Sequence, residues 1–148
     1  MVVMKFGGSS VLDASWIKRV LDIAQSRLGD APLLVSSAMG KTTDTLVAIA
    51  ASAAAGDRSA FERLEALRSA HLESCAALLS DSELEPASAR ITELFGELTS
   101  LVQGLTLIRE CTPRTYDALL SFGELLSTTL IAHGARERGI ETVVLDSR

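Results

Sequence analysis

The sequence of 148 residues has little cysteine, little proline and no block of positive charge. Its two cysteines, Cys75 and Cys111, have no second Cys or His at ligand spacing, which excludes a zinc site and a CxxC redox motif. Lys and Arg are scattered among acidic residues and the formal net charge is −5, so a nucleic acid or an anionic membrane is disfavoured as a partner. A small molecule or a protein is the expected partner.

Long apolar runs are also missing. No run approaches the roughly 20 residues that cross a membrane, and the N-terminus lacks the apolar stretch of a signal peptide. We therefore expect a cytoplasmic protein, which suits its sparse cysteines. The hydrophobic content of 47% is that of a globular protein, and this chain length predicts one domain with a real core.

The first third of the chain predicts alternating strands and helices. Residues 2–6 and 32–35 are short apolar runs typical of buried strands. Asp13 is placed to cap a helix that Gly29 would end, and a second helix is expected over about 45–55. This order implies parallel strands joined by a right-handed crossover.

The middle of the chain, about 58–110, has no candidate strand, and its apolar residues keep helical spacing. We expect a helical hairpin there, broken at about 81–86. Thr112 and Pro113 predict the start of a further helix, which Gly123 could interrupt and Gly139 would end. Residues 141–145 predict a third strand, whose open apolar edge would favour self-association.

The first candidate site follows the first strand, at residues 5–10 (KFGGSS). Gly7 and Gly8 would let backbone N–H groups approach an anion closely, and Lys5 adds a compact positive charge, so the segment suits a phosphate group. It is neither a GxxxxGK[ST] loop nor a GxGxxG fingerprint. From the residues alone, a plain glycine turn between strand and helix fits equally well.

A second candidate loop, residues 36–44, follows the second strand and is rich in hydroxyl groups. Both loops should open at the same edge of a parallel sheet, where open α/β sheets bind their ligands. Ser36, Ser37, Thr42 and Thr43 would place hydroxyls there. Alternatively, Thr43 or Asp44 caps the following helix, which does not exclude ligand contact.

Glu124 is the third candidate, because it is a carboxylate in an otherwise apolar and hydroxyl-bearing stretch. It could hold a substrate ammonium group by charge-assisted hydrogen bonding. Spacing alone would favour a solvated helix residue instead. His71 and His133 are isolated in helical patterns, and we interpret both as structural or surface residues.

Three segments together, residues 5–10 (KFGGSS), 37–44 (SAMGKTTD) and 121–127 (SFGELLS), resemble aspartate kinases in order and in approximate spacing. The resemblance covers essentially the whole chain. It implies the α/β amino-acid-kinase (carbamate-kinase-like) fold, a three-layer α/β/α sandwich with a mainly parallel sheet. Residues 1–148 would be the N-terminal portion of that catalytic domain, with a helical insertion at about 58–110 and no ACT regulatory domain.

The resemblance also implies roles for the matching residues. Lys5 would be catalytic, contacting the transferred phosphoryl group and neutralising its charge. The residues implied in binding the phosphates and ATP are Lys5, Phe6, Gly7, Gly8, Ser9, Ser36 and Ser37. Thr43 and Glu124 would bind the amino-acid substrate, Glu124 through its α-ammonium group. No residue is expected to bind a metal directly, since Mg2+ would arrive bound to ATP.

The implied reaction is phosphorylation of the side-chain carboxylate of L-aspartate by ATP, giving 4-phospho-L-aspartate. The sequence lacks the later Gly-Arg-Gly-Gly-Ser-Asp type loop of aspartate kinases and the arginine expected to clamp the aspartate carboxylates. We therefore expect a fragment that is inactive alone and that self-associates or forms a homo-oligomer. The alternatives are a non-catalytic ligand-binding or scaffold protein, or one half of a split kinase.

Overall fold

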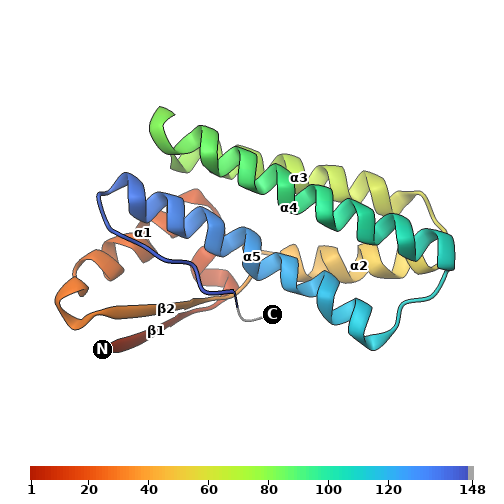
Figure 1. The fold of residues 1–148 in the computed structure, drawn as a ribbon, viewed down its shortest axis with the longest axis horizontal. Helices are drawn as coiled ribbons and strands as arrows, with labels where there is room; N and C mark the ends of the chain where they lie inside the picture. Colours follow the sequence, from red (N-terminus) through yellow and green to blue (C-terminus); the bar gives the residue numbers. More distant parts are fainter. Residues whose placement is uncertain (147–148) are drawn as a thin grey trace.

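The computed structural model describes residues 1–146, apart from the side chain of Asp81. In that part of the chain two parallel strands lie beside a set of α-helices that share one apolar core (Figure 1). The strands are β1 (Val2–Phe6) and β2 (Pro32–Ser36). The helices are α1 (Ala14–Gln25), α2 (Thr42–Ala54), α3 (Ser59–Leu78), α4 (Asp81–Ile108) and α5 (Pro113–Glu137), with short 3-10 helices η1 (Gly8–Val11) and η2 (Leu28–Asp30).

The predicted parallel pair is confirmed, with Lys5 opposite Val35 in the register. Asp13 caps the crossover helix α1 as expected, because its carboxylate accepts backbone N–H groups of Ser15 at 2.8 Å and Trp16 at 3.1 Å. The helix ends at Gln25, before Gly29 is reached. This crossover brings the carboxyl ends of β1 and β2 to the same edge of the sheet.

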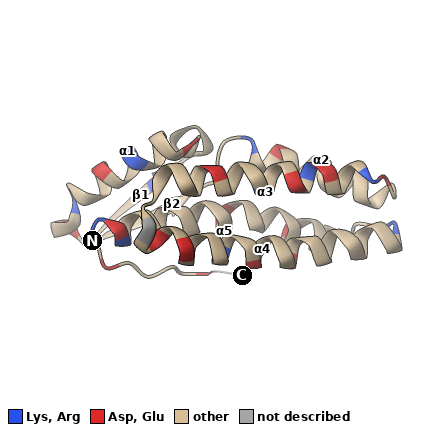
Figure 2. Ribbon diagram, turned by 90° about the horizontal axis from the view of Figure 1, so that it is seen from above, with Lys and Arg blue, Asp and Glu red and all other residues tan. Residues whose placement is uncertain are grey.

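Charged residues of both signs are interspersed along the helices (Figure 2). Their mixed distribution matches the scattered charges of the sequence. Within residues 1–146, no helix combines the length and the apolar character that a membrane span requires.

Helices α3 and α4 form the predicted hairpin, but the break lies at Leu79 and Ser80 and not at 81–86. Pro86 lies inside α4, where it removes one backbone hydrogen bond without ending the helix. Buried apolar residues directly after it, among them Ala87 and Ile91, hold α4 against the core. Helix α5 is likewise continuous through Gly123.

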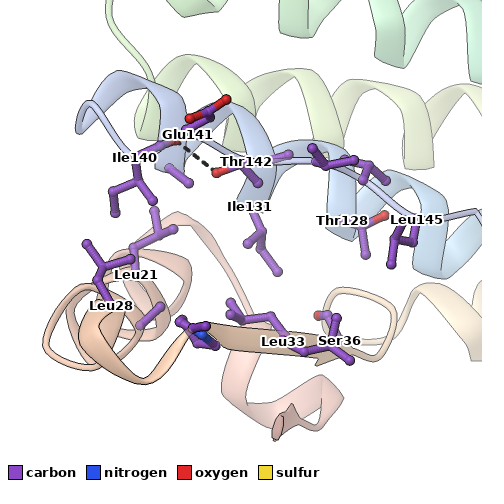
Figure 3. A pocket seen from close by; sticks show the side chains of 18 residues that line it. Leu21, Leu28, Leu33, Ser36, Thr128, Ile131, Ile140, Glu141, Thr142 and Leu145 are labelled. Atoms are coloured by element: carbon purple, nitrogen blue, oxygen red, sulfur yellow. Dashed lines mark hydrogen bonds between the residues drawn. The ribbon is translucent and has the colours of Figure 1, made fainter. Parts of the chain in front are cut away.

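The predicted third strand is wrong, because residues 141–146 form no strand. In the described part of the chain β2 pairs with β1 alone. The 141–146 segment returns beside α5, and a cavity of about 460 Å³ separates it from β2. Figure 3 shows Ile131 of α5 pointing into this cavity, toward β2. An apolar run becomes a strand only when a partner strand supplies the ladder, and among the described residues no strand pairs with this run.

His71 is a structural residue buried between α3 and α4, with its ring edge-on to Phe95 at 5.8 Å. Its Nδ1–H donates to the Leu67 carbonyl at 2.8 Å, while Nε2 has no partner among the described residues. Burial lowers the pKa of His71 below its usual value of 6.5. Protonation would place a charged, unpaired N–H in the core.

We expect the free energy of unfolding to fall as the pH drops below about 6.5, because the unfolded chain then binds a proton at His71 that the folded chain excludes. The loss from this group reaches at most about 1.4 kcal/mol at pH 5.5. Urea unfolding at pH 7.5 and 5.5 measures it. The His71→Leu variant should lose less stability over the same interval, and an equal loss in both proteins would contradict the assignment.

Candidate active site

Three segments meet where β1 and β2 end. β1 leads through Gly7 into η1, β2 leads through residues 37–41 into α2, and the middle of α5 packs against the second loop. The backbone N–H of Ser37 donates to the Phe6 carbonyl at 2.9 Å, which extends the pairing just beyond β2. Both loops therefore start side by side, as the parallel pairing predicts.

Lys5 is an exposed cation at this edge. Its Nζ donates a hydrogen bond to Ser37 Oγ at 3.3 Å, and a Cβ built on Gly7 would lie 3.5 Å from the same nitrogen. The ammonium group is thus held over the glycine turn and beside a hydroxyl of the second loop. Among the described residues it forms no ion pair with a carboxylate, so its charge is available to an anion.

The two loops approach each other through Gly8. A Cβ at this position would lie 3.2 Å from the Ala38 carbonyl oxygen and 3.3 Å from that of Gly40. Backbone atoms have no rotamer that would relieve such crowding, so a side chain here would push the loops apart. Gly40 itself has a φ of +54°, in the left-handed region that favours glycine.

Helix α5 holds the second loop through residues on one of its faces. Glu124 Oε1 accepts the backbone N–H of Ala38 at 3.2 Å. Ser127 Oγ donates to the Ser37 carbonyl at 2.8 Å. Gly123 leaves the space for Ala38, since a Cβ at Gly123 would lie 2.7 Å from that of Ala38.

The structure brings most of the predicted site residues together, at the ends of β1 and β2 and on α5. Ser36 is buried, and its hydroxyl donates to the Ser37 carbonyl at 3.0 Å. It therefore stabilises the loop conformation by an internal hydrogen bond. Ser9 lies exposed on η1 and Thr43 lies exposed in the first turn of α2. The alternative that Thr43 or Asp44 caps α2 is wrong, because α2 begins at Thr42 with Lys41 in the N-cap position.

The sequence did not predict Gly123 or Ser127 as site residues, although both lie in the 121–127 segment. Positions 123, 124 and 127 share one face of a helix, so the helical period could have grouped them around Glu124. What they contact could not be read from that period. In the described part of the chain, no three His, Cys, Asp or Glu side chains gather as a metal site.

Residues 1–148 match the model of the amino acid kinase family, and the chain belongs to this family. Within the family it is similar to aspartokinases. It is 35% identical to aspartokinase 1, chloroplastic, of Arabidopsis thaliana over 98% of this chain and 25% of that protein. It is 34% identical to lysine-sensitive aspartokinase 3 of Escherichia coli (strain K12) over 100% of this chain and 31% of that protein.

Solved structures agree with the sequence comparison. The chain superposes with a TM-score of 0.82 on E. coli aspartokinase III in complex with aspartate and ADP (R-state), and of 0.80 on that enzyme in complex with lysine and aspartate (T-state). Each is 33% identical, over 95% of this chain and 30% of the other. The expected N-terminal portion of the amino-acid-kinase fold is confirmed. The chain spans about a quarter to a third of these relatives.

Proposed function

We propose that this chain is the ATP- and aspartate-binding part of an aspartate kinase, which transfers the γ-phosphoryl group of ATP to the side-chain carboxylate of L-aspartate. One observation carries the proposal: Lys5 and Glu124, from opposite ends of the chain, both hold the same loop. Lys5 contacts Ser37 Oγ at 3.3 Å and Glu124 contacts the Ala38 N–H at 3.2 Å. A cation suited to phosphate and a carboxylate suited to an ammonium group thus contact neighbouring residues of one loop.

The proposed reaction asks for charge neutralisation more than for proton transfer. A carboxylate is already a nucleophile, so attack on phosphorus needs no general base. The enzyme must bring two anions together and stabilise the transferred group. Lys5 suits this role because its ammonium group is exposed and its described partner is a neutral hydroxyl. The backbone of Gly7 and Gly8, with Ser9 and Ser37, would complete the phosphate cradle.

Glu124 would recognise the substrate ammonium group. One carboxylate oxygen, Oε1, accepts the Ala38 N–H, while Oε2 takes no hydrogen bond among the described residues. This second oxygen remains available to a charged donor. Thr43, exposed at the start of α2, would contact the same substrate.

Mg2+ would enter bound to the nucleotide and would share the neutralisation of phosphate charge with Lys5. Magnesium commonly keeps substrate phosphates and water as ligands and takes few from the protein. The hydroxyl and backbone groups around Ser37 fit this arrangement, because they offer polar contacts without a cluster of carboxylates.

We also propose that the chain self-associates and is located in the cytoplasm. One face of the β1–β2 pair carries exposed apolar side chains, with Val3 opposite Leu33 and Val35 nearby. Exposed apolar surface of this kind favours association, so we propose a homo-oligomer or a self-associating chain. We place it in the cytoplasm, where its two free thiols would stay reduced.

Ligand titrations of the 15N-labelled 148-residue chain test the function. Mg-ATP is expected to shift the amide resonances of Gly7, Gly8 and Ser37, and L-aspartate that of Ala38. Binding is the chosen measurement because the chain spans only part of its relatives, and negligible turnover is expected of it alone. If neither ligand shifts these resonances, the kinase proposal is wrong and a scaffold role is favoured.

Glu124→Gln is expected to weaken L-aspartate binding at least about tenfold while leaving Mg-ATP binding nearly unchanged. The amide keeps an oxygen for the Ala38 N–H but loses the charge that would attract an ammonium group. Glu137→Gln is the matched control, because Glu137 also lies on α5 and accepts a backbone N–H, that of Ser80 at 2.8 Å. Equal aspartate affinity in both variants would remove Glu124 from the substrate site.

A further inference from the structure

The loop that connects β2 to α2 depends on α5 for its shape. Residues 37–41 belong to no helix or strand. The Ser37 carbonyl accepts two hydroxyl groups, Ser36 Oγ at 3.0 Å and Ser127 Oγ at 2.8 Å. Ser127 is fully buried, so solvent does not compete for its hydroxyl.

The Ser127 hydroxyl is not required by its own helix. Other hydroxyl side chains of α5 bond back to carbonyls of the same helix: Ser121 to Ala118 at 2.7 Å and Thr129 to Leu125 at 2.7 Å. Ser127 has such a contact with the Glu124 carbonyl at 3.0 Å, yet its shorter bond crosses to Ser37. The main hydrogen bond of this hydroxyl is therefore with the loop, at the Ser37 carbonyl.

Ser127 and Glu124 form hydrogen bonds with the two polar ends of a single peptide group. The carbonyl of Ser37 and the N–H of Ala38 belong to the same planar unit. Ser127 donates to the first at 2.8 Å and Glu124 accepts from the second at 3.2 Å. Fixing both ends sets the orientation of this peptide, and with it the direction of the Ser37 side chain that partners Lys5.

We propose that Ser127 is a positioning residue for the phosphate site, acting through this peptide clamp, and that the clamp couples the two substrates. The proposal rests on the proposed function of the site. Glu124 would hold the substrate ammonium with one oxygen and the clamped peptide with the other. A change at either end of the peptide would then alter the affinity for the ligand at the other end. Thermodynamic linkage makes this effect on the two affinities reciprocal.

The test compares Ser127→Ala with Ser121→Ala, which removes a hydroxyl from the same helix without touching the loop. Ser127→Ala is expected to weaken Mg-ATP binding about tenfold, the effect of losing one ordering hydrogen bond. It should also reduce the gain in Mg-ATP affinity that saturating L-aspartate produces. Ser121→Ala should match the wild type in both titrations. A well-dispersed Ser127→Ala spectrum with wild-type affinity and wild-type coupling overturns the proposal.

A measurement without ligand tests the peptide clamp independently of the proposed kinase function. Hydrogen exchange of the Ala38 amide should be faster in Ser127→Ala than in Ser121→Ala, and equal rates overturn the clamp. If the wild type binds no Mg-ATP, the kinase function fails, and exchange at Ala38 alone decides whether the clamp exists. If Ser127→Ala does not fold, Ser127→Cys, which keeps a weak donor, takes its place in each comparison.

Discussion

Lys5→Ala is expected to remove detectable Mg-ATP binding from the 148-residue chain. Loss of a charged hydrogen-bond donor corresponds to about 1.5–3 kcal/mol, and the upper end of that range is about a hundredfold in affinity. Lys5 should reach this upper end because it is the cation held over the Gly7 turn, without a competing carboxylate among the described residues. Titration with Mg-ATP, followed through the Gly8 and Ser37 amides, measures the loss.

The fold should survive this change. Lys5 is exposed, and its described hydrogen bond to Ser37 Oγ is a surface contact, so the free energy of unfolding should change by less than about 0.5 kcal/mol. Lys18→Ala is the control, because Lys18 Nζ donates to the Ala77 carbonyl at 3.0 Å, away from the two loops. Comparable Mg-ATP affinity in Lys5→Ala and Lys18→Ala would show that Lys5 does not bind phosphate.

Features with local causes could be predicted from the sequence. The Asp13 cap depends on backbone groups two and three residues away, so the residue type and its position were enough. The proximity of Lys5 and Ser37 could be predicted with one further assumption, that the two strands are parallel and end at the same edge of the sheet. The helical hairpin followed from its apolar period, although its break lies earlier than Pro86 suggested.

Features with distant causes could not be predicted. The apolar run at 141–145 has the composition of a strand, but a ladder needs a partner that the run itself does not specify. Gly123 has the local character of a helix breaker, yet α5 stays continuous because its flanking residues Leu119 and Leu126 are buried in the core. Ser127 looks like any hydroxyl in a helix until the loop that it contacts is in place. Packing between segments decides each case.

Gly123 is the glycine whose replacement should cost most. A Cβ there would lie 2.7 Å from the Ala38 Cβ, a separation that real Cβ atoms essentially never show. Ala38 has no rotamer with which to move away, so its backbone must shift. At Gly134 the atom at 2.7 Å is Leu21 Cδ1, the end of a flexible side chain that can turn aside. The same short distance therefore has different consequences at the two positions.

Gly123→Val is expected to lower the free energy of unfolding by about 3 kcal/mol, the upper range for overpacking a core. The valine methyl groups would also press on Leu46 and Thr42, whose side chains already lie 3.5 and 3.6 Å from a built Cβ. Urea denaturation measures the loss. Gly96→Val is the matched control in α4, because nothing lies within 4 Å of its Cβ position, and its stability should stay close to that of the wild type.

The same substitution should weaken the ligand site, because the displaced Ala38 carries the N–H that Glu124 accepts. Where folded Gly123→Val remains, at low temperature and without denaturant, its Ala38 amide should exchange faster and its Mg-ATP affinity should fall. Gly96→Val should retain both properties. If Gly123→Val is as stable as Gly96→Val and binds Mg-ATP equally well, α5 does not need a glycine to seat the loop, and the close packing of Ala38 on this helix is not what shapes the site.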